Sequence, residues 1–389
     1  MSSSSPDAKD ILKKLISFDT TSRYSNLACI GYIQDFLESL GASCRLTYDD
    51  AETKANIFAS LGPLDRPGLI LSGHTDVVPV DGQDWTTDPF SLTEANGRLY
   101  GRGTSDMKSF IALALAAAHR YAERPGRVPL HLSFSYDEEV GCLGVPRLID
   151  DMAAHLAHRP WACIVGEPTG LRVINGHKGK TTVHCRVRGR EAHSSLTHKG
   201  VNAIEHAGEV LAILAEIRDR IRHDGPIDES YDPPYTTVHV GVIQGGTALN
   251  IVPRTCDIHF EFRNLPTHDP MTLLDEIAGR VETEILPRMH ETDPDAGISF
   301  TLQGNFPPLE TDETSDIVDL VKNLTGENKT FKVPFGTEGG LFDRADIPTV
   351  VCGPGSIDQA HKPDEFILLE QFEAGRQFLG RLVDHLATA

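Results

Sequence analysis

The sequence predicts an α/β fold that carries a smaller inserted domain. In the first and last parts of the chain, short apolar runs of strand length alternate with helical patterns, which is typical of a sheet covered by helices on both faces. The middle part instead follows the order β-α-β-β-α-β, a split βαβ unit that forms a small domain in its own right. The length of 389 residues suits two or three domains of roughly 150 residues each.

The first part of the chain, residues 1–178, alternates helical and strand patterns. Apolar residues recur at helical spacing through residues 7–40, and residues 105–122 form an apolar, alanine-rich helix. The expected strands are short buried or alternating runs at 69–71, 130–136 and 162–165. Because these strands alternate with helices, we expect them to lie parallel in one sheet.

The middle part, residues 179–305, contains the patterns of four strands and two helices. The strands are expected at 181–187, 236–243, 255–262 and 298–302, and the helices at 202–221 and 271–286. After Pro307 the α/β pattern resumes, with a helix at 314–324, a strand at 348–352 and a last helix at 370–386. We therefore expect one discontinuous domain, residues 1–178 and 306–389, that is interrupted by the inserted domain.

The composition argues against two classes of partner. The formal net charge is −20, so the chain repels nucleic acid and anionic membrane surfaces. It has no run of about 18 apolar residues that could span a bilayer, and its polar start lacks an apolar signal region. The seven cysteines are odd in number, lack Cys-x-x-Cys spacing and mostly have apolar neighbours. Reduced thiols of this kind predict a cytoplasmic protein.

Residues able to bind metal follow the predicted strands of the larger domain. In open α/β sheets, ligand sites lie outside the carboxyl ends of the strands. An acidic residue also lies in the glycine-rich turn 101–107, which opens the alanine-rich helix. The five candidate ligands that can meet at this end of the sheet are His74, Asp106, Glu139, Glu167 and His361.

The residue types of this set suit zinc. Imidazole and carboxylate groups are suitable donors for Zn²⁺, and no thiolate is suitably placed. Five protein ligands exceed one tetrahedral catalytic site, but they fit two metals if one carboxylate bridges them. Glu138, next to Glu139, is then available as a general base.

Each of these residues also has an ordinary structural explanation. A single loop histidine is usually at the surface, a Glu-Glu pair is usually solvated, and Asp106 could serve partly as a helix N-cap. Their joint position after strands favours the metal site. A nucleophilic role for Cys142 is disfavoured, because its setting is apolar and no histidine is adjacent in sequence.

Five sequence motifs resemble those of the M20 metallopeptidase-type hydrolases and occur in the same order as in that family. The resemblance covers nearly the whole chain. The motifs are His74-Thr75-Asp76, the stretch 101–108, Asp137-Glu138-Glu139, Gly166-Glu167-Pro168-Thr169 and the stretch 189–195. The resemblance implies a zinc-hydrolase-type mixed sheet with helices on both faces as the catalytic domain. It further implies that the inserted domain is a ferredoxin-like lid and dimerisation domain.

The same resemblance implies a role for each site residue. One zinc would be held by His74, Asp106 and Glu167, and the other by Asp106, Glu139 and His361, with Asp106 bridging. Asp76 would orient the His74 ring, and Glu138 would move the proton. His193 would polarise the oxyanion, in the site of a partner subunit of a homodimer. The Asp106–Met107 peptide would be cis.

Four residues resemble substrate-facing positions of the family: Asn250, Arg263, Gly336 and Thr337. The tail 353–365 most resembles that of the family's deacetylases acting on N²-acetyl-L-ornithine, which implies a small N-acyl amino acid as substrate and a role in arginine biosynthesis. Desuccinylation of succinyl-diaminopimelate, aminoacylase and dipeptidase activities remain open, as does a non-catalytic binding protein on the same fold. Co²⁺ or Mn²⁺ could replace the two Zn²⁺ ions.

Overall fold

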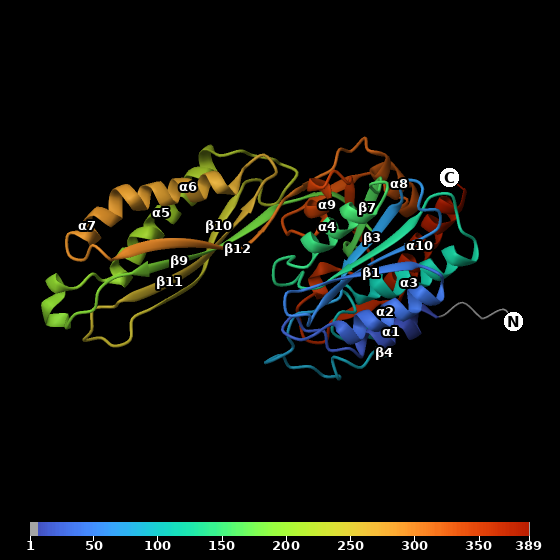
Figure 1. Cartoon of the computed structure of the whole chain (residues 1–389), viewed down its shortest axis with the longest axis horizontal. Helices are drawn as coiled ribbons and strands as arrows, with labels where there is room; N and C mark the ends of the chain where they lie inside the picture. The colour runs from blue at the N-terminus through green and yellow to red at the C-terminus, as the bar shows by residue number, and fades with distance from the viewer. Residues whose placement is uncertain (1–6, 389) are drawn as a thin grey trace. The chain divides into compact units, whose positions relative to one another are not determined.

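The structure is a computed structural model that describes residues 7–388, and the chain divides into two compact units (Figure 1). The first unit comprises the chain up to Gly176, Leu309–Lys332 and the chain from Thr337 onwards. The second unit comprises His177–Pro308 and Val333–Gly336. The inserted domain expected at 179–305 lies within the second unit. Its role as lid and dimerisation domain stays a prediction.

Within the described residues, a nine-stranded sheet forms the centre of the first unit. Its strands are β1 (Ser43–Tyr48), β2 (Ala55–Leu61), β3 (Leu69–His74), β6 (Leu130–Ser135), β7 (Ala162–Pro168), β8 (Val173–His177), β13 (Leu309–Glu310), β14 (Thr330–Val333) and β15 (Thr349–Gly353). They run in the order β1-β2-β6-β3-β7-β15-β8-β13, and β14 pairs with β8. The central strands β6, β3, β7 and β15 are parallel, whereas β1, β2 and β8 pair antiparallel. The sheet is therefore mixed, as the fold class predicted.

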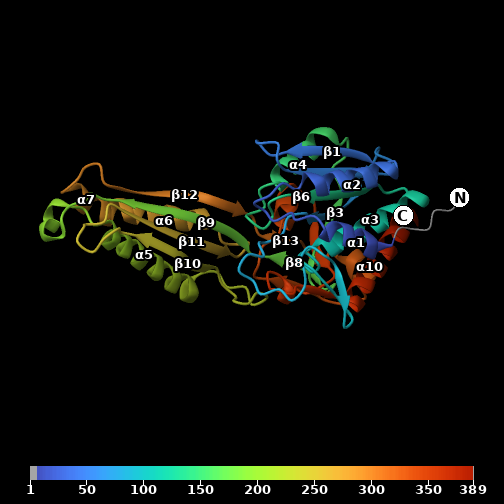
Figure 2. The ribbon, with the colours of Figure 1, turned by 90° about the horizontal axis from the view of Figure 1, so that it is seen from below.

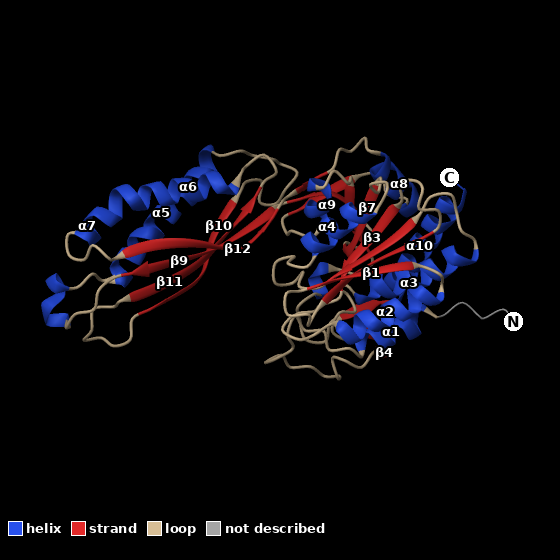
Figure 3. Cartoon of the chain, viewed as in Figure 1, coloured by secondary structure: helices blue, strands red, loops and turns tan. Residues whose placement is uncertain are grey.

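Helices cover both faces of this sheet (Figure 3). They are α1 (Ala8–Ile16), α2 (Leu27–Ser39), α3 (Lys108–Glu123), α4 (Val145–His155), α8 (Asp316–Thr325), α9 (Gly339–Arg344) and α10 (Leu369–Thr388). Leu69 and Leu71 of β3 belong to the large apolar core that also contains α3. Ile70, between them, is fully buried on the opposite face. Burial on both faces explains why these strands are continuous apolar runs.

The expected helical stretch 7–40 is interrupted between α1 and α2. The interrupting residues bind the segment just after β3: the Thr20 hydroxyl donates to the carbonyl of Thr75, and the Ser22 hydroxyl donates to Asp76 Oδ2 at 2.7 Å. Helical spacing alone could not show this break, because its cause is a contact more than 50 residues away along the chain.

A small three-stranded sheet joins the C-terminal tail to the first part of the chain. It consists of β16 (Phe366–Leu368), β5 (Arg98–Tyr100) and β4 (Thr93–Ala95), in that order. The Gly101 N–H also donates to the carbonyl of Glu365. These contacts place the turn before Asp106 beside the segment that follows His361.

The second unit has the predicted β-α-β-β-α-β order. Its elements are β9 (Gly179–Arg188), the 3₁₀ turn η1 (Ser194–Lys199), α5 (Ala203–Asp224), β10 (Thr237–Gly245), β11 (Thr255–Asn264), α6 (Pro270–Arg280), the π turn η2 (Val281–Ile285), α7 (Leu286–His290) and β12 (Gly297–Phe306). The sheet order β10-β11-β9-β12 is that of a ferredoxin-like unit (Figure 2). Alternate residues of β9 are buried with apolar residues of α5 and α6, which form a separate core.

Two further observations bear on the composition. All seven cysteines are free thiols, and six of them are buried. None of the helices within residues 7–388 combines the length and apolar character that a membrane crossing requires.

Candidate metal centre

The candidate ligands come from the carboxyl ends of the parallel strands and from two loops beside them. His74 is the last residue of β3, and Glu167 lies near the end of β7. Glu139 lies in the turn after β6. Asp106 precedes α3, and His361 follows the 3₁₀ turn η3 (Ile357–Gln359). The fold thus brings together residues that are almost 290 positions apart in the sequence.

Asp106 lies between the two histidines. Its Oδ1 is 3.1 Å from Nε2 of His74, and its Oδ2 is 3.3 Å from Nε2 of His361. Glu167 Oε1 is 3.5 Å from the first of these nitrogens, and Glu139 Oε2 is 3.1 Å from the second. Each oxygen of Asp106 therefore faces a different histidine–glutamate pair, which is the arrangement that a bridging carboxylate requires.

These separations suit a metal. Ligand atoms about 2.0–2.2 Å from a tetrahedral zinc lie roughly 3.3 Å from one another. Two groups of three potential ligands have all their donor atoms within 4.8 Å of one another: His74, Asp106 and Glu139, and His74, Glu138 and Glu167. The second group contains Glu138, so the geometry also permits this residue to approach a metal.

His74 is oriented by the backbone of the turn that follows it. Its Nδ1 lies 2.9 Å from the carbonyl oxygen of Asp76, and in the tautomer that donates a proton there Nε2 keeps the lone pair. The nearer carboxylate oxygen of Asp76 is 3.6 Å from Nδ1. That carboxylate instead accepts the N–H groups of Glu138 and Glu139, at 3.1 and 3.3 Å. Asp76 therefore holds the His74 ring and the Glu138–Glu139 turn together.

The site gathers more negative than positive charge. Burial, followed by the nearby charge of Asp106, raises the pKa of Glu139 and raises that of Glu167 well above its usual range. Burial lowers the pKa of His74, but hydrogen bonding to Asp106 and Asp76 and the charges of the other nearby carboxylates together outweigh burial and hold the pKa well above the ordinary value. Hydrogen bonds to Asp106 and Glu139 raise the pKa of His361 to about 10. These raised pKa values favour protonated carboxyls and imidazoles. Bound cations would instead favour the deprotonated forms.

Glu138 differs from its neighbour. It keeps some exposed surface, yet burial of its carboxyl raises the pKa to about 8, and the charge of His74 acts in the opposite direction. The Cys142 thiol lies 3.4 Å from Oε1 of Glu138. Burial raises the pKa of this thiol well above its usual range, which argues against a nucleophilic cysteine.

Sequence reasoning passed over a buried acid beneath the site, Glu338. It is fully buried, and its two carboxylate oxygens accept the hydroxyls of Ser72 on β3 and Ser135 on β6. These strands carry His74 and the turn with Glu138. The only sequence signal was an acidic residue inside the stretch Gly336-Thr337-Glu338-Gly339-Gly340.

That stretch was expected to face substrate. Thr337 is buried, and its hydroxyl accepts the N–H of Gly339 at 3.0 Å. A side chain at Gly336 would meet the ring of Phe306 at 2.1 Å, so the close packing accounts for this glycine. The substrate role of Gly336 and Thr337 stays a prediction.

The other three predicted residues lie in the second unit. His193 is exposed and pairs with Ile251, and the Ser194 N–H donates to the carbonyl of Asn250. His193 and Asn250 are therefore neighbours. Arg263 lies at the opposite end of the sheet, where it pairs with Lys180, the second residue of β9.

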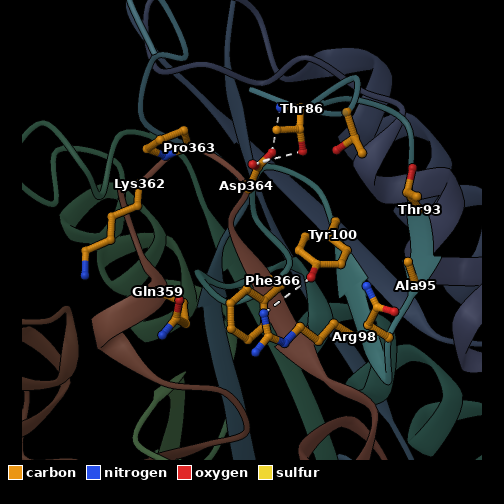
Figure 4. A pocket seen from close by; sticks show the side chains of 12 residues that line it. Thr86, Thr93, Ala95, Arg98, Tyr100, Gln359, Lys362, Pro363, Asp364 and Phe366 are labelled. Carbon is orange, nitrogen blue, oxygen red and sulfur yellow. Dashed lines mark hydrogen bonds between the residues drawn. The ribbon is translucent and has the colours of Figure 1, made fainter. Parts of the chain in front are cut away.

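A polar hollow of about 430 Å³ lies beside the loop that carries His361 (Figure 4). Arg98, Tyr100, Lys362 and Phe366 line it. Its carboxylate, Asp364, already accepts two hydrogen bonds from Thr86. The hollow therefore offers no set of metal ligands, and the metal centre is the stronger candidate site.

Comparison with known proteins gives a family and a fold. The sequence matches Peptidase family M20/M25/M40 over residues 70–385. Acetylornithine deacetylase of Proteus mirabilis (strain HI4320) is 37% identical over 377 residues, which cover 95% of this chain and 93% of that protein. Two solved structures share the fold. An M20 family metallo-carboxypeptidase from Sulfolobus solfataricus has a TM-score of 0.78 at 19% identity, covering 98% of this chain and 99% of that one. A dinuclear metal binding peptidase of the M20 family from Bacillus subtilis has a TM-score of 0.68 at 14% identity, covering 98% and 97%.

The expected cis peptide bond is present between Asp106 and Met107.

We predict that the purified chain binds two divalent ions, because two sets of ligand atoms flank Asp106. Elemental analysis after zinc reconstitution measures the stoichiometry. Chelation should abolish hydrolytic activity, and adding zinc back to the same sample should restore it, which separates metal loss from unfolding. A reconstituted, folded protein without metal would contradict the assignment.

Proposed function

The chain belongs to Peptidase family M20/M25/M40 and is a metal-dependent amidohydrolase, and we propose that it deacetylates N²-acetyl-L-ornithine. The products are L-ornithine and acetate, and the reaction is a step of arginine biosynthesis. The observation that carries this proposal is 37% identity with an acetylornithine deacetylase over 95% of the chain. The seven free thiols support a cytoplasmic location, which stays a prediction.

We assign the metal ligands as two sets that share Asp106, and we propose zinc as the metal. His74 and Glu167 complete one set, and Glu139 and His361 complete the other. The assignment is supported by the separations of 3.1–3.5 Å between the donor atoms. When bound, two zinc ions would supply an activated water and polarise the amide carbonyl.

Glu138 is the proposed general base. It accepts a proton from the attacking water and returns it to the amide nitrogen, so the C–N bond breaks and acetate and the free amine leave. A carboxyl whose pKa is raised toward neutrality suits both transfers. Because Glu138 must be deprotonated to act as a base, activity should fall as the pH drops below its pKa in the metal-loaded enzyme.

Rival activities share this chemistry. A succinyl-diaminopimelate desuccinylase, an aminoacylase or a dipeptidase would use the same ligands and the same base. A catalytically inactive binding protein on this fold is disfavoured, because every predicted metal ligand and the base meet in one cluster. The choice among the enzymes depends on the groups that contact the side chain and the acyl group of the substrate.

The sheet register of the second unit supports a shared active site. Arg263 pairs with Lys180 on β9, whereas His193 follows Arg188 at the other end of the strand. Eight residues of strand separate these ends, roughly 26 Å at 3.3 Å per residue. Arg263 and His193 of one chain therefore cannot both contact one amino-acid-sized substrate. We propose a homodimer, in which the two residues at one site come from different subunits.

The chemical state of His193 suits an oxyanion contact. Its Nδ1 accepts the N–H of Ser195 at 3.2 Å, so the proton of a neutral ring lies on Nε2. His193 is exposed, and this Nε2–H can donate to a developing negative charge on a substrate oxygen.

We predict different outcomes at the two adjacent glutamates. Glu138→Gln should keep both metals and lower kcat by about 10³-fold, with little change in KM, because an amide cannot accept the proton. Glu139→Ala should lose affinity for one metal. Elemental analysis and steady-state kinetics on both variants distinguish the roles. Near-normal turnover of Glu138→Gln, or loss of a metal from this variant alone, would reverse the assignment.

A substrate panel tests the proposed reaction. On zinc-loaded protein we expect the highest kcat/KM for N²-acetyl-L-ornithine, compared with N-succinyl-diaminopimelate, N-acetyl-methionine and dipeptides. A higher value for another compound would reassign the enzyme within its family. Failure to hydrolyse any of them, with both metals bound, would favour the non-catalytic alternative.

Mixed subunits test the shared site. His193→Ala and Glu138→Ala chains should each be nearly inactive alone, and their heterodimer should recover activity, because one of its two sites has both groups. The measurement is activity after subunit exchange, with each variant mixed with itself as the control. Verified heterodimers that stay inactive would show that His193 acts within its own chain or not at all.

A further inference from the structure

A buried carboxylate, Glu365, binds the turn that carries Asp106. Its Oε1 accepts the N–H groups of Ser105 and Asp106, at 2.8 and 3.0 Å. Its Oε2 accepts the N–H of Gly103 at 3.0 Å and Nη1 of Arg102 at 2.6 Å. Both Glu365 and Arg102 are only 1% exposed. Four donors from one short turn thus converge on a single side chain that lies about 260 residues farther along the chain.

The four partners of Glu365 are all hydrogen-bond donors. Every group that faces its two oxygens in these bonds is a donor, so a carboxyl proton would meet another hydrogen. Arg102 balances the charge, and charge-assisted hydrogen bonds of this kind are roughly twice as strong as neutral ones. An apolar or amide side chain could not satisfy the same donors, and unsatisfied buried donors are costly.

The same network reaches the His361 loop. Nη2 of Arg102 donates to Oε1 of Gln83 at 2.6 Å, and Nε2 of Gln83 donates to the carbonyl oxygen of His361 at 3.0 Å. The Trp85 indole N–H also donates to Oε1 of Gln83. On the outer side of the loop, Asp364 binds Thr86 through two hydrogen bonds (Figure 4). Residues 83–86 therefore connect the turn before Asp106 to the loop of His361.

We propose that Glu365 is a positioning residue, which holds the backbone of Asp106 in register with His361 through Arg102 and Gln83. The inference rests on the proposed two-metal site, whose second set of ligands includes Asp106 and His361. Asp106 and His361 belong to separate loops, so the geometry of the second ligand set depends on the contacts that connect these two loops. The Glu365 side chain binds Asp106 at its backbone N–H and not at its carboxylate, so it acts on this ligand through the backbone.

Metal binding and a spectroscopic signature test this role directly. Glu365→Gln should weaken binding of the more loosely held ion by roughly 10–100-fold, the usual effect of removing a group that supports a ligand. Chelator competition measures the dissociation constants. The visible absorption of the cobalt-substituted protein should change in position or intensity, because it depends on ligand geometry. With saturating metal, kcat should fall while KM changes little.

A matched control separates positioning from general destabilisation. Ile367→Ala removes a buried apolar side chain two residues away and lies outside the polar network. It should lower the melting temperature but leave the metal dissociation constants and the cobalt spectrum unchanged. If Glu365→Gln does not fold, Gln83→Ala provides the test, because it removes the link between Arg102 and the His361 loop, together with the acceptor of the Trp85 indole, and leaves Glu365 in place. This variant should show the same spectral change to a smaller extent.

The outcomes distinguish this inference from the proposed function. If the wild-type protein binds two ions and Glu365→Gln binds them with the same constants and the same cobalt spectrum, the positioning role is wrong. Unchanged values in a folded Gln83→Ala protein would likewise refute the connection to His361. If the wild-type protein binds no metal, the proposed function itself fails.

Discussion

The mutual repulsion of buried carboxylates at one edge of the central sheet is the constraint on which the site depends. Asp106, Glu138, Glu139 and Glu167 lie around two imidazoles, and burial raises the pKa of all three glutamates. Groups with this excess of negative charge remain close only when protons or cations bind them. A bridging position for Asp106 is compatible with this repulsion, because each of its oxygens faces one histidine–glutamate pair. The site is therefore organised around charge that the protein alone does not balance.

Three further acids in the surrounding structure hold these groups at a short distance, because their carboxylates accept hydrogen bonds from the turns and strands that carry the site. Asp76 accepts backbone N–H groups of the Glu138–Glu139 turn, Glu338 accepts hydroxyls from two strands, and Glu365 accepts four donors of the turn before Asp106. Each acid joins segments that are far apart in the sequence. Satisfied polar networks of this kind favour one geometry, because any shift leaves a buried donor unpaired.

The sequence predicted those parts of the site that follow regular elements. His74 and Glu167 end apolar strands long enough to recognise, and the mixed α/β fold around them is confirmed. Glu338 and Glu365 were missed because their partners lie about 200–270 residues away, so no local pattern reveals them. Strands of three residues, such as β16, are too short to show alternation. The expected helix 271–286 instead has a π turn after Arg280, and the chain resumes as an α-helix that continues to His290. Helical spacing does not distinguish these forms.

The second unit raises a different question, which concerns substrate choice. The proposed ligand set and base would act on the amide bond, which is common to every rival substrate. Discrimination must therefore come from groups that contact the amino-acid side chain or the acyl group. His193 and Asn250 lie together at one end of the second unit, and Arg263 lies at the other. If one substrate needs contacts from both ends, a single chain cannot provide them, and the proposed homodimer would then be a condition for substrate specificity.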